Sequence, residues 1–170
     1  IGMNLWVADK FTYPKAPLER GKVMHQEDLA KLNEFNRYED KDGDGIPYRS
    51  LPGAHSPLAP YFTRGSGHDE KARYTENSAT YKRVLDRLRK KFETAKNIVP
   101  KPLIDIIPGA EVGLIAFGST DIVIPEARDS IGKVGLKTSY LRLRAYPFHD
   151  DVGKFIAQHK RIYVIEQNRD

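Results

Sequence analysis

The chain has 170 residues, with 28 lysine and arginine residues against 23 aspartate and glutamate residues and a formal net charge of +5. It contains no cysteine, which excludes disulfides, thiolate zinc sites, a cysteine nucleophile and a cysteine-ligated iron–sulfur cluster in this sequence. No apolar run approaches the roughly 20 residues of a membrane span, and no signal-peptide pattern is recognised. We therefore expect a cytoplasmic protein without a membrane partner. Because the first residue is Ile1 rather than methionine, we also expect a piece of a longer polypeptide.

Residues 1–38 are expected to pack on something upstream of them. They open on an apolar run, Ile1-Gly-Met-Asn-Leu-Trp-Val7, and continue into a stretch punctuated by prolines. A short helix is predicted over 26–33, with Leu29 and Leu32 as its apolar positions. So small a segment does not bury a core alone.

An acidic turn follows, which we define as residues 40–45, Asp-Lys-Asp-Gly-Asp-Gly. Its spacing copies the first half of a calcium-binding loop, with oxygen ligands at positions one, three and five and glycine at position six. Position twelve, a bidentate glutamate in such a loop, is Leu51 here, so the second half is not supplied. The pattern favours a plain acidic turn over a metal site.

The stretch from Gly45 to Tyr74 is the most informative part of the chain. It is punctuated by Pro47, Pro52, Pro57, Pro60, Gly65 and Gly67. Because proline fixes φ and glycine permits positive φ, such backbone is irregular but stiff. Stiff irregular backbone is suited to presenting polar side chains at a site. The alternative is a long surface connection whose charges are simply solvated.

A basic amphipathic helix is predicted from Asn77 or Ser78, either of which can cap it, to about Asn97, before Pro100. Its apolar stripe consists of Tyr81, Val84, Leu85, Leu88, Phe92 and Ala95. The basic residues between them are Lys82, Arg83, Arg87, Arg89, Lys90 and Lys91. We interpret these charges as a solvated outer face. No aromatic-interleaved basic motif accompanies them, so no nucleic-acid partner is expected.

The last sixty residues alternate between strand and helix patterns. Strands are predicted over 112–117, 140–145 and 161–165, and helices near 121–132 and 150–159. Alternation at these lengths predicts right-handed crossovers and adjacent parallel strands of one sheet.

The segment Gly118-Ser-Thr-Asp121 follows the first of those strands and opens a helix. Backbone N–H groups at such a place can bind an anion, but the segment lacks the three-glycine fingerprint of dinucleotide-binding folds. A plain helix cap by Thr120 or Asp121 is the favoured interpretation.

Seven segments taken together carry a family resemblance. They are GMNLWVADKF, YEDKDGDGIPYRSLPG, YFTRGSGHDEKARYTEN, KFETAKNIVPKP, IAFGSTD, YLRLRAYPF and YVIEQNRD. In this order and at this spacing they resemble the C-terminal portion of the alpha subunit of 2-oxoacid:ferredoxin oxidoreductases. The resemblance is closest to the fused gamma–alpha subunit of bacterial 2-oxoglutarate:ferredoxin oxidoreductase.

The resemblance implies an α/β fold of several parts. A transketolase C-terminal-like parallel-sheet domain would be preceded by an irregular arm and by the tail of a pyrimidine-type domain that binds thiamine diphosphate. Residues 1–60 would be that tail with its exit loop. Residues 61–107 would be a linker with the basic helix, and residues 108–170 the transketolase C-terminal-like domain, truncated at its end.

The resemblance also implies the chemistry. The family carries out CoA-dependent oxidative decarboxylation of a 2-oxoacid, here 2-oxoglutarate, and passes the electrons to ferredoxin. Thiamine diphosphate, magnesium and an iron–sulfur cluster would belong to the assembled complex, held mainly by a partner beta subunit. None of them would be bound by this chain alone, and the chain alone would be inactive.

The same resemblance names candidate site residues, none of them catalytic or metal-binding. Arg49 and Thr63 would bind the substrate, and His68, Asp69 and Glu70 would lie near the subunit interface and the active site. A guanidinium suits a 2-oxoacid because it forks onto a carboxylate through two charge-assisted hydrogen bonds. For Arg49 the structural alternative is a salt bridge to the Asp42 or Asp44 carboxylate of the acidic turn. For His68 it is a hydrogen bond with Asp69 or Glu70 that closes the loop.

A second class of function stays open from the sequence. The chain would then be a non-catalytic βαβ docking module whose irregular arm wraps a partner protein. An upstream pyrimidine-type domain would favour the enzyme, and an unrelated upstream domain would favour the docking module.

Overall fold

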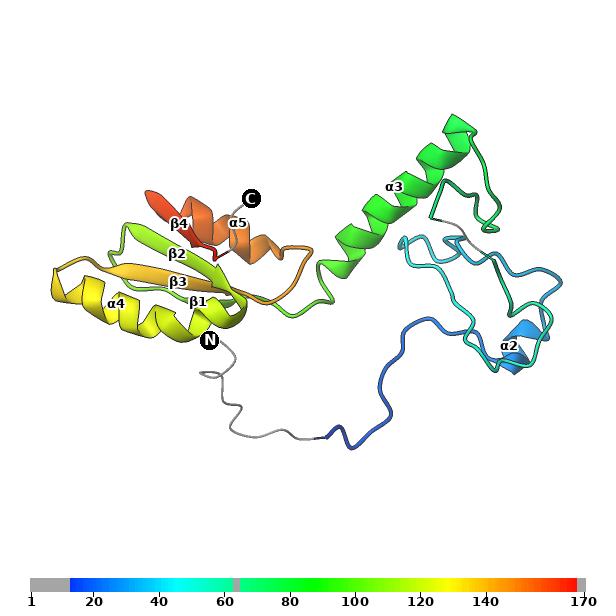
Figure 1. Ribbon diagram of the computed structural model, residues 1–170, viewed down its shortest axis with the longest axis horizontal. Coiled ribbons are helices and arrows are strands. Elements are labelled where there is room, and N and C mark those ends of the chain that lie inside the picture. The colour runs from blue at the N-terminus through cyan, green and yellow to red at the C-terminus, as the bar shows by residue number, and fades with distance from the viewer. Residues whose placement is uncertain (1–12, 63–64, 168–170) are drawn as a thin grey trace. The chain divides into compact units, whose positions relative to one another are not determined.

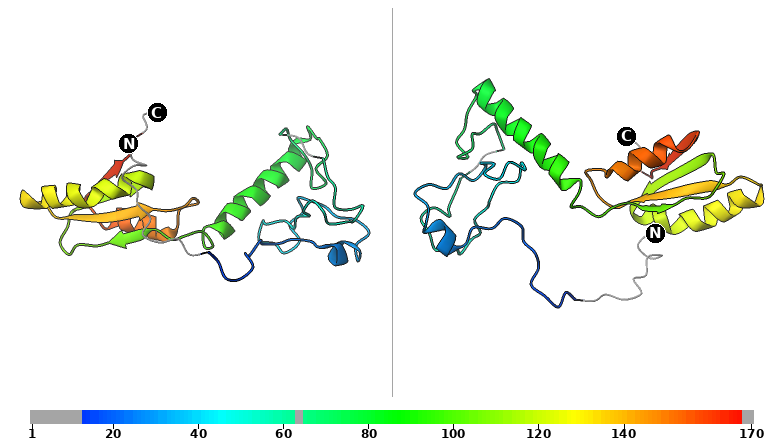
Figure 2. Two further views of the ribbon diagram at one scale, coloured as in Figure 1. Left: turned by 60° about the horizontal axis from the view of Figure 1, so that its bottom comes forward. Right: turned by 180° about the vertical axis from the view of Figure 1, so that it is seen from behind.

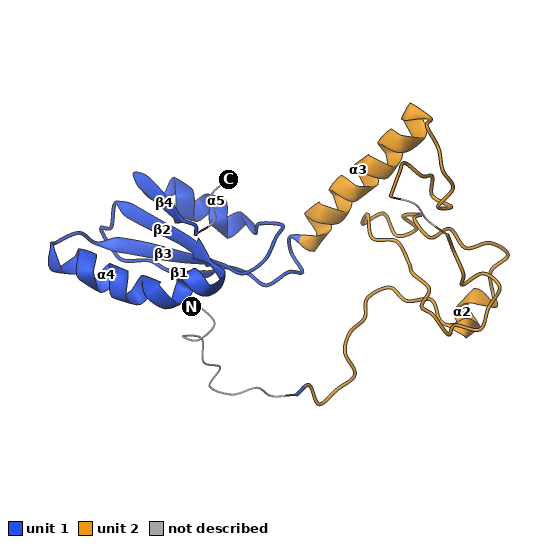
Figure 3. Ribbon diagram, viewed as in Figure 1, with its two compact units in different colours: residues 1–13, 96–170 blue, residues 14–95 orange. Residues whose placement is uncertain are grey.

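The computed structural model describes residues 13–62 and 65–167. They fall into two compact units, an arm unit of residues 14–95 and a sheet unit that includes residues 96–167 (Figure 3). The predicted division into 1–60, 61–107 and 108–170 refers to the domains of the resembled family and stays a prediction. Within the described ranges, no helix combines the length and the apolar character needed to cross a bilayer.

The sheet unit is built on a four-stranded sheet, whose strands are labelled in Figure 1. They are β1 (Leu103–Asp105), β2 (Val112–Phe117), β3 (Thr138–Leu143) and β4 (Arg161–Ile165), in the spatial order β1-β3-β2-β4. β2 pairs in parallel with both β3 and β4, whereas β1 is antiparallel to β3. The prediction of three adjacent parallel strands is confirmed, with β2 in the middle.

Helices connect the parallel strands. The 3₁₀-helix η1 (Gly118–Val123) leads into α4 (Ile124–Lys133) between β2 and β3, and α5 (Asp150–Ala157) joins β3 to β4. The two crossovers step across the sheet in opposite directions, so right-handed connections place α4 and α5 on opposite faces (Figure 2). Both predicted helices are confirmed, although 3₁₀ geometry precedes the first one.

The core of the sheet unit lies between α5 and the central strands. Ile115 and Leu141 of the sheet form one buried cluster with Val152 and Phe155 of α5. Gly113 leaves room for the Phe155 ring, because a Cβ atom at this position would lie 2.8 Å from Phe155 Cε1. The close approach of α5 to the sheet therefore depends on a position without a side chain.

Strand β1 is not predicted by the sequence. It has three residues, all of them exposed, and therefore no alternation of buried and exposed positions. Its backbone pairs with β3, and its Asp105 forms an ion pair with Arg128 of α4 at 2.7 Å. Pairing with a strand about 35 residues away thus produces an element that local pattern does not show.

The predicted capping role of Thr120 or Asp121 is wrong. Neither η1 nor α4 has a side-chain cap. The Asp121 carboxylate instead accepts a hydrogen bond from the Tyr140 hydroxyl at 2.8 Å and pairs with Arg142 at 3.0 Å. Burial, together with this hydrogen bond, raises the pKa of Tyr140. The Asp121 carboxylate therefore interacts with two side chains of β3, which lie close to it only in the folded sheet.

The arm unit contains two helices in mostly irregular backbone, α2 (Gln26–Leu29) and α3 (Ser78–Ala95). α2 is shorter than the predicted 26–33. Leu29 is its only buried residue, so a longer helix would gain little stability from packing. α3 matches the predicted basic helix. The Asn77 side chain accepts from the Thr80 amide at 2.9 Å, which confirms the predicted cap.

The interpretation of the basic face of α3 as purely solvated needs correction. Arg87 is half-buried and donates to the Gly45 carbonyl oxygen at 2.9 Å, and its burial lowers its pKa. Thr94 donates to the Asp44 carbonyl oxygen at 2.5 Å. Of the predicted apolar stripe, Val84 is the one buried residue. The acidic turn therefore docks on a polar side of the helix.

Candidate functional site

The backbone around Arg49 is held by a short parallel pairing within the arm unit. The Arg49 amide donates to the Lys22 carbonyl oxygen, and the Met24 amide donates to the Arg49 carbonyl oxygen, both at 2.9 Å. The Arg49 guanidinium donates from Nη2 to the Arg20 carbonyl oxygen at 2.7 Å, and the residue is exposed. Arg49 is thus anchored at its backbone and at one nitrogen, while its other donors point to no partner among the described residues.

Lys22 makes the ion pairs that the sequence offered as an alternative for Arg49. Its Nζ lies 2.5 Å from Asp42 Oδ2 and 2.8 Å from Asp44 Oδ2. Among the described residues no carboxylate pairs with Arg49, so that structural alternative is not formed. An ammonium group lies between the carboxylates of the acidic turn. In residues 13–62 and 65–167 no cluster of three histidine or acidic side chains is arranged to hold a metal ion.

This arrangement predicts an acid-sensitive arm. Hydrogen bonds from Lys22 lower the pKa of both Asp42 and Asp44 below the ordinary value of 3.8. Their contribution to stability is therefore complete above the unfolded-state pKa and is lost as the pH falls through the lower folded-state pKa values. We expect hydrogen exchange at the Met24 and Arg49 amides, corrected for intrinsic rates, to accelerate as the pH falls below about 4. Asp42→Asn/Asp44→Asn should flatten this pH dependence, and an unchanged profile in that variant would contradict the expectation.

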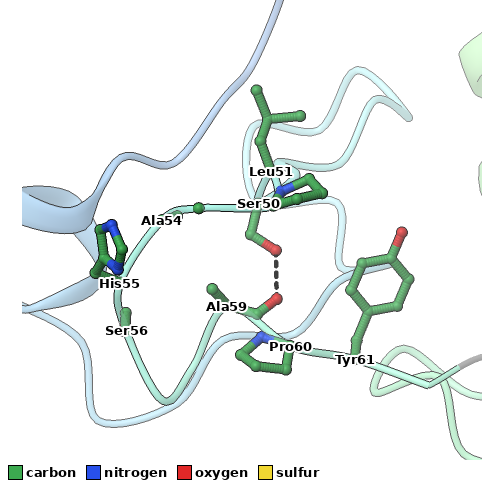
Figure 4. A pocket seen from close by; sticks show the side chains of 10 residues that line it. Ser50, Leu51, Ala54, His55, Ser56, Ala59, Pro60 and Tyr61 are labelled. Carbon is green, nitrogen blue, oxygen red and sulfur yellow. Dashed lines mark hydrogen bonds between the residues drawn. The ribbon is translucent and has the colours of Figure 1, made fainter.

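The loop from Ser50 to Tyr61, which directly follows Arg49 in the sequence, encloses a hollow of about 570 Å³ (Figure 4). The buried Ser50 hydroxyl donates to the Ala59 carbonyl oxygen at 2.6 Å and closes the neck of this loop. The Arg37 guanidinium lies 5.0 Å from the centroid of the Tyr61 ring and holds the end of the loop by a cation–π contact. Neither Arg49 nor the residues 68–70 line the hollow.

The residues predicted near a subunit interface form a tight loop before α3. His68 Nδ1 lies 2.9 Å from the Asp69 carbonyl oxygen, and its ring centroid lies 4.2 Å from that of Tyr38. The Asp69 carboxylate accepts from the Lys71 and Arg73 amides, both at 2.9 Å. In this chain these contacts order the loop. The placement of this loop near a subunit interface stays a prediction.

Glu70 joins the same loop to α3, because its carboxylate accepts a hydrogen bond from Arg83 at 3.3 Å. Thr63, the second predicted substrate-binding residue, lies outside the described residues. Among the described residues, no hydrogen bond or ion pair joins Arg49 with His68, Asp69 or Glu70. The structure thus supports two separate local arrangements in the arm unit, one around Arg49 and one before α3.

Two residues that organise the site were missed at the level of sequence, namely Lys22 and Gly45. Lys22 lies 20 residues before the first of its carboxylate partners, and no local pattern links them. Gly45 did carry a signal, since it occupies the glycine position of the half calcium loop. That signal indicates a tight turn, but it does not indicate the helix α3 that packs against Gly45.

Comparison with known proteins agrees with the motif-based resemblance. No protein-family model matches the chain. It is 27% identical over 159 residues to subunit alpha of 2-oxoacid:ferredoxin oxidoreductase 2 from Aeropyrum pernix, covering 91% of this chain and 23% of the relative. It is also similar to the solved 2-oxoglutarate:ferredoxin oxidoreductase from Magnetococcus marinus with 2-oxoglutarate, coenzyme A and succinyl-CoA bound. That match has a TM-score of 0.66 and 26% identity, and covers 81% of this chain and 24% of the other.

The chain therefore spans about a quarter of the length of these relatives. Both relatives come from ferredoxin oxidoreductases that are named for a 2-oxoacid or for 2-oxoglutarate. Each match covers most of the present sequence. The chain is thus similar to part of the alpha subunit of a 2-oxoacid:ferredoxin oxidoreductase, as its motifs predict.

Proposed function

We propose that the chain forms part of the alpha subunit of an oxidoreductase that converts 2-oxoglutarate and CoA into an acyl-CoA thioester and CO₂, with electrons passed to ferredoxin. The relatives named above support the class of reaction, and the bound molecules of the Magnetococcus marinus structure support the choice of substrate. The sheet unit would correspond to the transketolase C-terminal-like domain. Residues 1–60 would be the end of a pyrimidine-type domain and its exit loop, and the enzyme would be cytoplasmic.

A partner beta subunit would hold thiamine diphosphate, its magnesium and the iron–sulfur cluster. When bound, thiamine diphosphate supplies a carbanion equivalent and an electron sink for decarboxylation. Nothing in the described residues assigns a ligand for these groups to this chain, so its own task would be to bind and orient the substrate.

The observation that carries the proposal is the state of the Arg49 guanidinium. It is exposed, and it donates to the Arg20 carbonyl oxygen rather than to a carboxylate of the described residues. A guanidinium in this state can fork onto the carboxylate beside the reacting carbonyl group of a 2-oxoacid. Because its backbone is anchored on both sides, it would fix the orientation of the substrate as well as its affinity.

Replacing Arg49 tests the proposal in the assembled enzyme. Loss of a charge-assisted pair costs about 1.5–3 kcal/mol, so Arg49→Ala should lower kcat/KM for the 2-oxoacid about 10- to 150-fold. Arg49→Lys should recover part of the loss, because an ammonium cannot fork onto two oxygens.

Arg20→Ala is the matched control, because it removes an exposed arginine side chain but keeps the carbonyl oxygen that Arg49 contacts. This variant should have nearly normal kinetics. If Arg49→Ala kept normal kcat/KM but melted at a lower temperature, Arg49 would be a structural residue and the proposed role would be wrong.

A further inference from the structure

The Lys22 side chain lies along residues 42–48, the segment that leads to Arg49, and contacts every second residue of this segment. These contacts are the Asp42 and Asp44 carboxylates, the Ile46 carbonyl oxygen and the Tyr48 ring. The ammonium nitrogen lies 3.2 Å from the Ile46 oxygen and 5.3 Å from the centroid of the Tyr48 ring. The side chain is only 21% exposed. A single cation thus lies along one side of residues 42–48.

The backbone of Lys22 completes the connection. Its carbonyl oxygen accepts the hydrogen bond of the Arg49 amide, so one residue holds the segment through its side chain and Arg49 through its main chain. The middle of the segment is fixed as well, because Gly45 is packed against the backbone of α3. Arg49 therefore lies at the end of a short segment that is held by the Lys22 side chain, by the Lys22 main chain and by α3.

We propose that Lys22 is a positioning residue for Arg49, and that its ammonium takes the place that a bound cation would have in a calcium-type loop. The proposal rests on the proposed function, in which Arg49 binds the substrate carboxylate. Lys22 acts in two ways. It sets the direction in which the backbone presents Arg49, and it neutralises Asp42 and Asp44, which would otherwise compete with the substrate for the guanidinium.

The test uses kinetics of the assembled enzyme with Lys22→Met, Arg49→Ala and the double variant. Misplacement of a binding group by about 1 Å costs up to roughly 100-fold, so Lys22→Met should lower kcat/KM about 10- to 100-fold, mainly through a higher KM. Because Lys22 acts through Arg49, the double variant should be no worse than Arg49→Ala alone. Lys22→Arg keeps a cation and should retain most of the activity.

Lys31→Met is the matched control, since the Lys31 side chain is 75% exposed and belongs to the same unit. It should leave KM unchanged. If Lys22→Met does not fold, Asp44→Asn decides the question in its place, with the same expected dependence on Arg49.

The outcomes separate the two proposals. Losses that add in the double variant would overturn the positioning role, as would normal kinetics in both Lys22→Met and Asp44→Asn while Arg49→Ala is defective. Normal kinetics in Arg49→Ala would instead overturn the proposed function of Arg49 itself.

Discussion

Gly45→Ala is expected to lower the free energy of unfolding of the arm unit by about 2–5 kcal/mol, the sum of left-handed backbone strain and overpacking. Gly45 has a φ of +81°, and an added Cβ atom would lie 2.3 Å from the Lys91 amide nitrogen and 2.8 Å from the Arg87 carbonyl oxygen. Both atoms belong to the backbone of α3, which cannot move aside as a side chain can. The acidic turn would therefore separate from the helix, and the hydrogen bond from Arg87 to the Gly45 carbonyl oxygen would be lost with it.

Gly53→Ala is the matched control. Gly53 has a φ of +88°, and nothing lies within 4 Å of an added Cβ atom. This variant should therefore carry the backbone strain alone, about 1–2 kcal/mol. Urea unfolding followed by hydrogen exchange at α3 amides measures the two effects in the full chain. Equal destabilisation by both substitutions would mean that Gly45 does not dock closely on α3.

Phe155→Ala is expected to destabilise the sheet unit by about 3–5 kcal/mol, the usual cost of emptying a fully buried aromatic site. Phe155 is 1% exposed and belongs to the buried cluster between α5 and the sheet. Its ring lies over Gly113, where no side chain is present to fill the space that the substitution opens. Hydrogen exchange at β2 and β3 amides, measured as a function of urea concentration, gives the loss for this unit separately from the arm.

Ile156→Ala, one position further along α5, controls for the change in helix composition. Ile156 is 46% exposed, so its truncation should cost about 1 kcal/mol or less. If the two variants of α5 were equally stable, the packing of α5 on the sheet would not hold the unit together.

The roles proposed for Arg49 and Lys22 differ in how far the sequence alone points to each residue. The motif Gly-Ile-Pro-Tyr-Arg, read with the six other segments, identifies Arg49 as a candidate on the linear chain. Lys22 has no such motif, and its importance follows only from the acidic turn folding back onto it. For the same reason the sequence offers nearby Arg49, and not the distant lysine, as the alternative salt-bridge partner of the acidic turn.

The sequence by itself determined the elements whose pattern is local. The period of apolar residues predicted α3, the apolar strand centres predicted β2, β3 and β4, and their alternation with helices predicted parallel pairing. These features follow from the geometry of a few consecutive residues and from the handedness of crossovers, which every chain of L-residues shares.

Only the tertiary structure decided which distant groups meet. In the folded chain Lys22 pairs with the acidic turn, and Asp121 interacts with Tyr140 and Arg142. Gly45 packs against α3, and β1 pairs with β3 at the edge of the sheet. A short polar side chain or a three-residue strand could pair with several other parts of the chain, and these pairings would have similar energies. The choice among those partners is made by the packing of each unit, because the docking of the backbone brings one set of distant groups within hydrogen-bond distance and keeps the others apart.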